Sequence, residues 1–391
     1  MGFRAVPTMT LAILMGAMAA AGDAPFFEKT VVLARGERPG AYAIPKIVVT
    51  PKDTAIIVGQ DRRGGDWGRR IAPFCLRSTD GGKTWSIPAS LLPEDFPNQA
   101  DYLLKPTGIV VDRKTGRVFV FISRSPLRSP GGKLIDEIWF YTHIQETRRY
   151  GRDWFLVHSD DEGASWSPPQ EVTEQLIVKP YWQEWSPVHT GIQLQFGAHQ
   201  GRLLVPVRCY CPEQDPSEHD TKYQTNAVIY SDDGGKTWTP GGKSDPHLGE
   251  CSVAEGSDGA IYINQRVSKG REGERWYAVS HDGGDSFAPS CGTGLEDARC
   301  HAGLLRYAAP EGNVFLLSNV PGPKRTGLSI SVSRDEGETW ERRRVVHAGH
   351  TAYSDLAVLA DRTVLCVYET GEKTSRKDLA VARFNWAWLE P

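Results

Sequence analysis

The sequence has few cysteines, almost no net charge and hardly any helical periodicity. Its seven cysteines are an odd set without a CxxC pair, so a zinc site is not expected, and no metal or cofactor is predicted. The net charge of −3 argues against the broad basic surface that nucleic-acid binding needs. The expected partner is therefore a glycan or another small molecule. The lack of helical periodicity favours an all-β chain.

Long apolar runs are also missing. The run over residues 9–18 is too short to cross a bilayer, which takes about 20 residues. It follows Arg4 and precedes alanines 19–21, which is the order of features in a secretory signal peptide. We therefore expect residues 1–21 to be removed, and the mature chain, residues 22–391, to be secreted or periplasmic without a membrane span.

A pattern close to Ser-x-Asp-x-Gly-x-Thr-Trp occurs five times along the chain. In such a pattern the Ser and Asp side chains bond the backbone of their own tight turn, a Gly adopts a positive φ, and the aromatic ring packs beneath the hairpin. The aspartates are therefore predicted to stabilise turns rather than to act in catalysis. The copies cover residues 78–85, 159–166, 231–238, 280–287 and 333–340, with aspartates Asp80, Asp161, Asp233, Asp282 and Asp335.

Short β-rich segments lie between these copies. Turn motifs that recur about every 50 to 80 residues between short strands are typical of a β-propeller, in which each blade is a small antiparallel sheet. We expect residues 22–391 to form one propeller domain. The segments are residues 108–111, 117–122, 203–208, 261–264, 314–317 and 363–368.

The repeated turns resemble the Asp-boxes of the sialidase (neuraminidase) superfamily, and the resemblance extends from about Tyr42 to Glu369. It implies an all-β fold, a six-bladed β-propeller with Asp-box turns. It also implies an exo-acting glycoside hydrolase that removes a terminal sialic acid or a related ulosonic acid. Asp-boxes occur in other propellers and in carbohydrate-binding proteins as well, so a functional prediction must rest on other residues.

A sialoside carries a carboxylate on its anomeric carbon. Arginines suit that group because their planar fork binds a carboxylate in a bidentate manner. A carboxylate nucleophile would be repelled by the substrate, whereas a neutral tyrosine hydroxyl would not. The tyrosine then needs a glutamate as base, and a separate aspartate must serve as acid and base for the leaving group and the water.

Two parts of the sequence resemble the family's segments for these roles. Glu250 and Arg266 match its strand-turn-strand arrangement, which implies Glu250 as the base and Arg266 as a carboxylate-binding arginine. Arg325 and Tyr353 match its closing blades, which implies Arg325 as a second such arginine and Tyr353 as the nucleophile. The alternatives are a solvated hairpin with chance charges and a tyrosine of the core.

The loop before the first Asp-box holds the family's acid/base aspartate. Asp66 is the best match, and Asp61 is the alternative. Arg62 matches an arginine that lines the pocket in relatives, although an arginine-rich surface loop would look the same.

The first-strand motif departs from the family's Tyr-Arg-Ile-Pro, because Ala43 stands at the position of the arginine. Glu369 matches the glutamate that steadies that arginine, so another cation should lie beside it, with Lys46, Arg62 and Arg63 as candidates. Alternatively, the ligand differs. The chain would then be a non-catalytic glycan-binding propeller or a glycosidase that acts on a different sugar.

Overall fold

The computed structural model describes residues 24–63, 71–94, 96, 102–128, 153–178, 183–210, 224–246, 248–267 and 273–390. Within these ranges the regular structure is almost entirely β-strand, and its helices are the four-residue turns α3 (Thr173–Leu176) and α4 (Trp386–Leu389). The all-β prediction is confirmed. The predicted signal segment, residues 1–21, lies outside the described residues.

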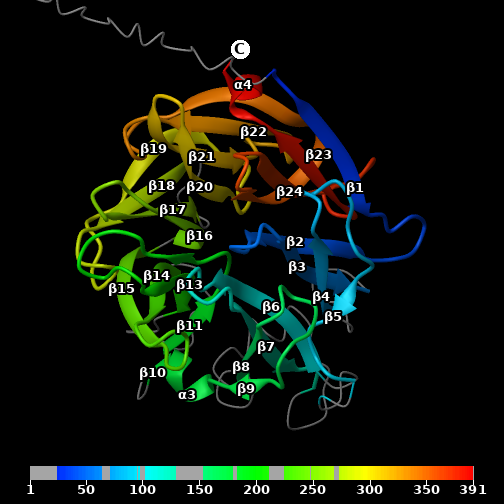
Figure 1. The fold of residues 1–391 in the computed structure, drawn as a ribbon, viewed down its shortest axis with the longest axis vertical. Helices are drawn as coiled ribbons and strands as arrows, with labels where there is room; N and C mark the ends of the chain where they lie inside the picture. Colours follow the sequence, from blue (N-terminus) through cyan, green and yellow to red (C-terminus); the bar gives the residue numbers. More distant parts are fainter. Residues whose placement is uncertain are drawn as a thin grey trace, which may run out of the picture.

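Four antiparallel sheets follow one another around a centre, near which β2, β6, β13 and β16 lie (Figure 1). Three have four strands, and the third along the chain has six. In chain order they are β2 (Ala41–Val49), β3 (Ala55–Arg62), β4 (Ile71–Ser78) and β5 (Ala89–Ser90); β6 (Tyr102–Val111), β7 (Val118–Pro126), β8 (Asp153–Ser159) and β9 (Gln170–Glu171); β10 (Ile177–Val178), β11 (Gln183–Pro187), β12 (Ile192–Gln193), β13 (Leu203–Tyr210), β14 (Gln224–Ser231) and β15 (Thr239–Pro246); and β16 (Leu248–Glu255), β17 (Ile261–Val267), β18 (Glu274–Ser280) and β19 (Cys291–Glu296).

A fifth, seven-stranded sheet closes the ring. The N-terminal strand β1 pairs with the last strand, β25, so the two ends of the chain meet in one sheet (Figure 1). In spatial order its strands are β1 (Phe27–Leu33), β25 (Asp378–Phe384), β24 (Val364–Thr370), β23 (Glu341–Val358), β22 (Thr326–Ser333), β21 (Gly312–Asn319) and β20 (Gly303–Ala309).

The propeller arrangement is confirmed, but the prediction of six blades is wrong as stated. The described residues form four separate blades and one seven-stranded sheet. The reason is the 18-residue strand β23, which pairs with β22 up to His350 and with β24 from Thr351 onward. One continuous strand thus joins what the six-bladed propeller implied by the resemblance would have as two sheets.

Apolar residues fill the spaces between neighbouring sheets. Val48 and Ile56 of the first sheet pack with Ile109 and Val120 of the second, and similar clusters join each further pair around the ring. A further cluster lies within the seven-stranded sheet, between the parts that β23 joins. Burial between sheets therefore holds the inner strands around a common axis.

The repeated turns have the predicted geometry. In the third copy the Ser231 hydroxyl donates to Asp233 Oδ1 at 2.8 Å, and the Thr237 amide and hydroxyl donate to the same carboxylate at 2.9 and 2.7 Å. Gly234 and Gly235 have φ values of 72° and 86°. The aspartates thus bind their own turns, as predicted from the pattern.

Candidate active site

Three side chains predicted to act together come from inner parts of two sheets and meet near the axis. Tyr353, on β23, donates its hydroxyl hydrogen to Glu250 Oε1 on β16 at 2.8 Å. Arg266, on β17, donates through Nη1 to Glu250 Oε2 at 2.5 Å and to Tyr353 Oη at 2.6 Å. The structure therefore brings the predicted nucleophile, base and first arginine into one hydrogen-bonded group.

Irregularities in strand pairing contribute to this meeting. Leu248 and Cys251 pair with Val267 and Gln265, so two residues of β16 stand opposite Arg266 alone. On β23 the register shifts in the same way between Thr351 and Ser354, around Tyr353. Such β-bulges bend a strand and re-aim its side chains, and they are frequent beside active sites.

The charge states of the pair follow from their surroundings. Burial opposes ionisation of Glu250, but the positive charges of Arg266 and Arg208 and the hydrogen bond from Tyr353 lower its pKa to about 2. Burial raises the pKa of Tyr353 well above its ordinary value, and Arg266 only partly opposes this. At neutral pH a protonated tyrosine hydroxyl therefore faces an ionised carboxylate.

Further arginines surround the tyrosine ring. The guanidinium carbon Cζ lies 5.8 Å from the ring centroid in Arg266, 6.0 Å in Arg325 and 5.5 Å in Arg376. Arg325 also donates through Nη2 to the Arg299 carbonyl at 3.1 Å. Arg325 was predicted from the sequence, whereas Arg376, in the connection from β24 to β25, was not.

Glu369 is completely buried behind this group. Its Oε1 accepts the Ile44 amide at 2.8 Å, its Oε2 accepts the Tyr353 amide at 3.3 Å, and Arg376 Nε lies 3.7 Å from Oε2. Burial raises the pKa of Glu369, and the charge of Arg376 is the first effect that opposes this rise. The glutamate thus holds the backbone of Tyr353 in place. Ala43 is fully buried on β2.

The predicted acid, Asp66, falls outside the described residues, so its role stays a prediction. The alternative, Asp61, is 9 % exposed and pairs with Arg35 and, at 2.8 Å, with Arg63 Nε. Arg62 donates through Nε to Gln60 Oε1 at 2.9 Å, and its charge helps to lower the pKa of Glu369.

Two further polar residues, Lys46 on β2 and Asp355 on β23, are buried. Lys46 was expected as a candidate cation beside Glu369, whereas Asp355 was given no role. Lys46 donates to the carbonyls of Ile44 and Pro106 at 3.1 and 3.2 Å, and burial lowers its pKa to about 7. Asp355 accepts the Ile47 amide at 2.9 Å and the Thr190 hydroxyl at 2.6 Å, and burial raises its pKa to about 7. The sequence signal was present but weak, because Asp355 follows Tyr353 by two residues and so belongs to the same strand.

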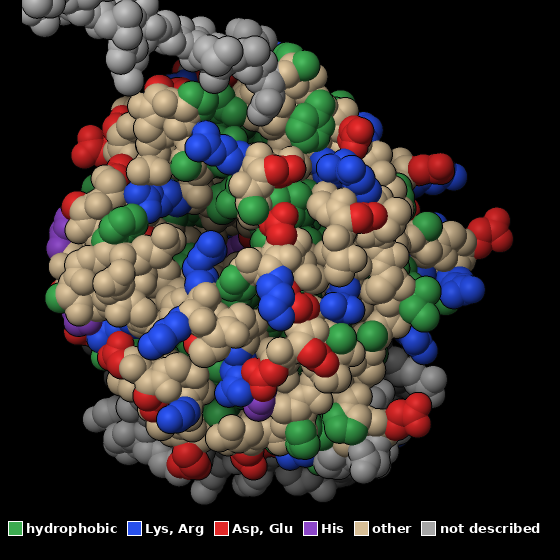
Figure 2. Space-filling view, viewed as in Figure 1, with side chains coloured by type: hydrophobic (Ala, Val, Ile, Leu, Met, Phe, Trp, Pro, Cys, Tyr) green, Lys and Arg blue, Asp and Glu red, His purple; other side chains and the backbone are tan. Residues whose placement is uncertain are grey.

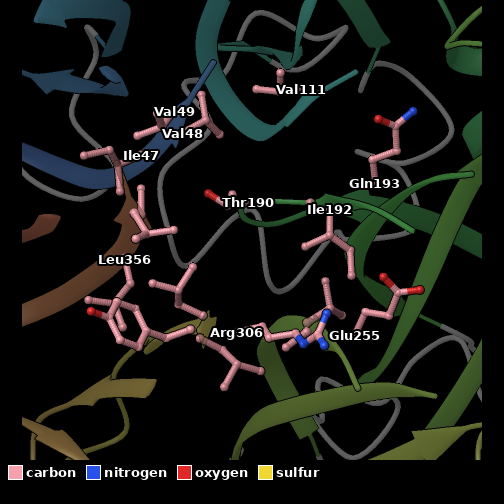
Figure 3. A pocket seen from close by; sticks show the side chains of 18 of the residues that line it. Ile47, Val48, Val49, Val111, Thr190, Ile192, Gln193, Glu255, Arg306 and Leu356 are labelled. Carbon is pink, nitrogen blue, oxygen red and sulfur yellow. The ribbon is translucent and has the colours of Figure 1, made fainter. Parts of the chain in front are cut away.

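A cavity of about 430 Å³ lies further along the inner strands, and Ile47, Glu255, Arg306 and Leu356 are among the residues around it (Figure 3). Glu255 follows Glu250 on β16, and Leu356 follows Tyr353 on β23. On β16 Glu250 and Glu255 lie toward opposite ends of the strand, and Tyr353, Glu250 and Arg266 are not among the residues that line the cavity. The hydrogen-bonded group of Tyr353, Glu250 and Arg266 is therefore separate from this cavity.

On the face shown in Figure 2, acidic and basic side chains are interspersed around a central hollow. In the described part of the chain, no helix is long and apolar enough to cross a membrane. The same residues contain no group of three or more His, Cys, Asp or Glu side chains placed to hold a metal ion.

Known proteins share the repeat and the fold. The family model of the BNR repeat-like domain matches residues 126–366, and that of the BNR/Asp-box repeat matches residues 76–86. The chain is 31% identical to a sialidase of Micromonospora viridifaciens, an alignment that covers 96% of this chain and 56% of that protein. It is 27% identical to a sialidase of Bacteroides fragilis, with 85% and 61% covered. The chain thus spans 56% to 61% of the length of these two relatives.

Solved structures agree on the fold. The chain superposes on a Hadza microbial sialidase with a TM-score of 0.75 at 22% identity, covering 91% of this chain and 68% of that one. It superposes on the intramolecular trans-sialidase from Ruminococcus gnavus with a TM-score of 0.71 at 19% identity, covering 92% and 98%. At these identities the superpositions establish a shared propeller architecture.

Proposed function

This chain belongs to the sialidase superfamily of BNR-repeat proteins, and we propose that it is an exo-acting glycosidase that hydrolyses a terminal sialic acid or a related ulosonic acid. The observation that carries the proposal is the 2.8 Å hydrogen bond from Tyr353 to Glu250, with Arg266 bound to both. A hydroxyl held against a partly buried, ionised carboxylate is a nucleophile paired with its base. The relatives named sialidases support the class of substrate.

In the first step Tyr353 Oη attacks the anomeric carbon and its proton passes to Glu250. The glycosidic bond breaks, its electron pair leaves with the aglycone oxygen, and the proposed acid Asp66 gives that oxygen a proton. The product is a tyrosyl glycoside. Arg266 and Arg325 bind the substrate carboxylate, whose negative charge disfavours a carboxylate nucleophile.

Substrate binding also explains how Glu250 becomes basic enough. In the free protein Arg266 holds the pKa of Glu250 low. A substrate carboxylate beside Arg266 adds a negative charge near Glu250 and competes for the same guanidinium. Both effects raise the pKa of Glu250 and therefore its affinity for the tyrosine proton.

In the second step a water molecule attacks the anomeric carbon from the face that the aglycone left. Asp66 takes a proton from that water, the bond to Tyr353 Oη breaks, and Glu250 returns its proton to the tyrosine oxygen. Two displacements at one carbon give retention of configuration.

The test is covalent trapping. An activated sialoside with a ring fluorine that slows the second step should leave an adduct on Tyr353, detected by mass mapping of peptides. Tyr353→Phe, which keeps the ring but lacks the hydroxyl, is the control and should remain unlabelled. An active protein that carries its adduct on another residue would contradict the mechanism.

Ala43 favours a second candidate, a non-catalytic glycan-binding propeller. The family's Tyr-Arg-Ile-Pro motif has an arginine at this position, whereas the side chain of Ala43 is apolar and buried. That candidate predicts binding of sialosides without turnover. The same trapping experiment separates the two, since a pure binding protein forms no adduct.

We also propose that the protein is exported and that residues 22–391 are its mature domain. The support is the sequence of residues 1–21, which lie outside the described part. Intact mass measurement of protein from the growth medium or periplasm of an expression host should give a chain that begins near residue 22. Retention of Met1 in exported protein would contradict this proposal.

A further inference from the structure

The buried carboxylate of Glu369 has a cationic neighbour that its resemblance to the family does not predict. The matching arginine position is Ala43, whose side chain is fully buried and carries no charge. An unpaired carboxylate buried as deeply as Glu369 would be strongly unfavourable. The structure provides an ion pair instead, with Arg376 Nε 3.7 Å from Glu369 Oε2.

Arg376 approaches from a different part of the chain. It lies seven residues after Glu369, in the connection between β24 and β25, whereas Ala43 lies on β2. Its side chain is 24% exposed, so the guanidinium reaches both the buried glutamate and the solvent side of the site. It lies nearer the Tyr353 ring centroid, at 5.5 Å, than either Arg266 or Arg325.

The cations expected from the sequence are engaged differently. The amino group of Lys46 donates to the carbonyls of Ile44 and Pro106. Arg63 pairs with Asp61, and its side chain is 59% exposed. Arg62 donates to Gln60. The charge of Arg376 lowers the pKa of Glu369 more than the charge of Arg62 does.

We propose that Arg376 binds the carboxylate of the substrate together with Arg266 and Arg325, and that Glu369 orients it for this purpose. This assignment rests on the function proposed above. The three guanidinium groups surround one tyrosine ring at nearly equal distances, and planar guanidinium forks suit a single carboxylate. The ligand class is a sugar acid whose carboxylate sits on the carbon that Tyr353 attacks.

The proposal predicts a specific pattern of binding among four proteins. The probe is free N-acetylneuraminic acid, titrated by calorimetry. Arg376→Ala should weaken binding about tenfold or more, because it removes charge-assisted hydrogen bonds to the carboxylate. Ala43→Arg alone should tighten binding less than about twofold, since Arg376 already occupies the space beside Glu369. Ala43→Arg in the Arg376→Ala background should recover most of the lost affinity, because the new arginine can then pair with Glu369.

Lys373→Ala is the matched control, because Lys373 lies in the same connection, is exposed and carries the same charge. It should change the affinity less than about twofold. Arg376→Lys keeps a charge beside Glu369 but lacks the fork, and it should bind more weakly than the wild type. Thermal unfolding shows whether each variant is folded. If Arg376→Ala is not, Arg376→Lys provides the test in its place.

Trapping on Tyr353 separates this assignment from the function on which it rests. If the wild type binds the probe and is labelled, and folded Arg376→Ala and Arg376→Lys bind as tightly as the wild type, the role of Arg376 is wrong while the glycosidase proposal stands. If the wild type neither binds nor is labelled, both fail. Weaker binding by Arg376→Ala, with labelling of Tyr353 kept at saturating donor, supports both.

Discussion

Replacing Glu250 with glutamine removes the proposed base while it keeps the shape of the side chain. The glutamine can still accept a hydrogen bond from Tyr353, but it cannot take its proton. A general base contributes roughly 100- to 10,000-fold to a rate, so kcat for an activated aryl sialoside should fall within that range. KM should change less, because Arg266 and Arg325 remain.

The same change has a consequence for stability that follows from the pKa of Glu250. A decrease from its ordinary value of 4.5 to about 2 corresponds to ~3 kcal/mol in favour of the folded state when the carboxyl is ionised. Because the folded pKa is lower than the unfolded one, this contribution is complete above pH 4.5 and is lost as the pH falls through about 2. Glu250→Gln should lack this part of the pH dependence.

The assay is urea unfolding of both proteins at a series of pH values between 2 and 6, beside steady-state kinetics at neutral pH. The control is Glu255→Gln on the same strand. Glu255 is buried and accepts the amides of Gln195 and Phe196 at 2.7 and 3.0 Å, and no hydrogen bond joins it to Tyr353 among the described residues. Its replacement should lower stability and leave kcat/KM within about twofold of the wild type. A kcat for Glu250→Gln within threefold of the wild type would refute the role of base.

Two further substitutions test the acid and the turns. Asp66→Ala should lower the rate of hydrolysis about 100-fold more for a substrate with a poor leaving group than for an activated aryl substrate, because an activated phenolate departs without a proton. Equal losses of rate for both substrates would contradict the role of Asp66 as acid, and Asp61 would be tested next. Asp233→Ala removes the acceptor for the Thr237 amide and hydroxyl, so the free energy of unfolding should fall by ~1–2 kcal/mol while KM stays constant. A changed KM for Asp233→Ala would contradict a purely structural role.

Local features were the most predictable part of this fold. The Asp-box turns could be predicted because each is closed by hydrogen bonds within a few residues, such as those of Asp233. Glu250 and Arg266 could be grouped because one hairpin joins them. The continuity of β23 was not predictable, since the choice between one long strand and two short ones depends on pairing with β22 and β24 along its length.

Contacts made by connections were the least predictable part. The ion pair of Asp61 with Arg35 joins residues 26 positions apart in the sequence, so it could not be predicted from the residues around Asp61. Arg376 lies in a turn of polar residues, where nothing in the local sequence distinguishes it from its exposed neighbour Lys373. Its role depends on the path of the turn back over Glu369, which only the three-dimensional structure specifies.

Glu369 explains how β2 can keep its place in the site although it carries Ala43 where the family's motif has an arginine. Ile44 adopts a φ of 50°, which is uncommon for a β-branched residue, and the strand pairing is irregular there. In that conformation the Ile44 amide donates to Glu369, so β2 contributes a backbone donor to the carboxylate. The charge comes from Arg376, and the second oxygen also accepts the Tyr353 amide. The Glu369 carboxylate thus links β2, β23 and the β24–β25 connection. An arginine on any segment that comes close to this carboxylate can therefore supply the positive charge.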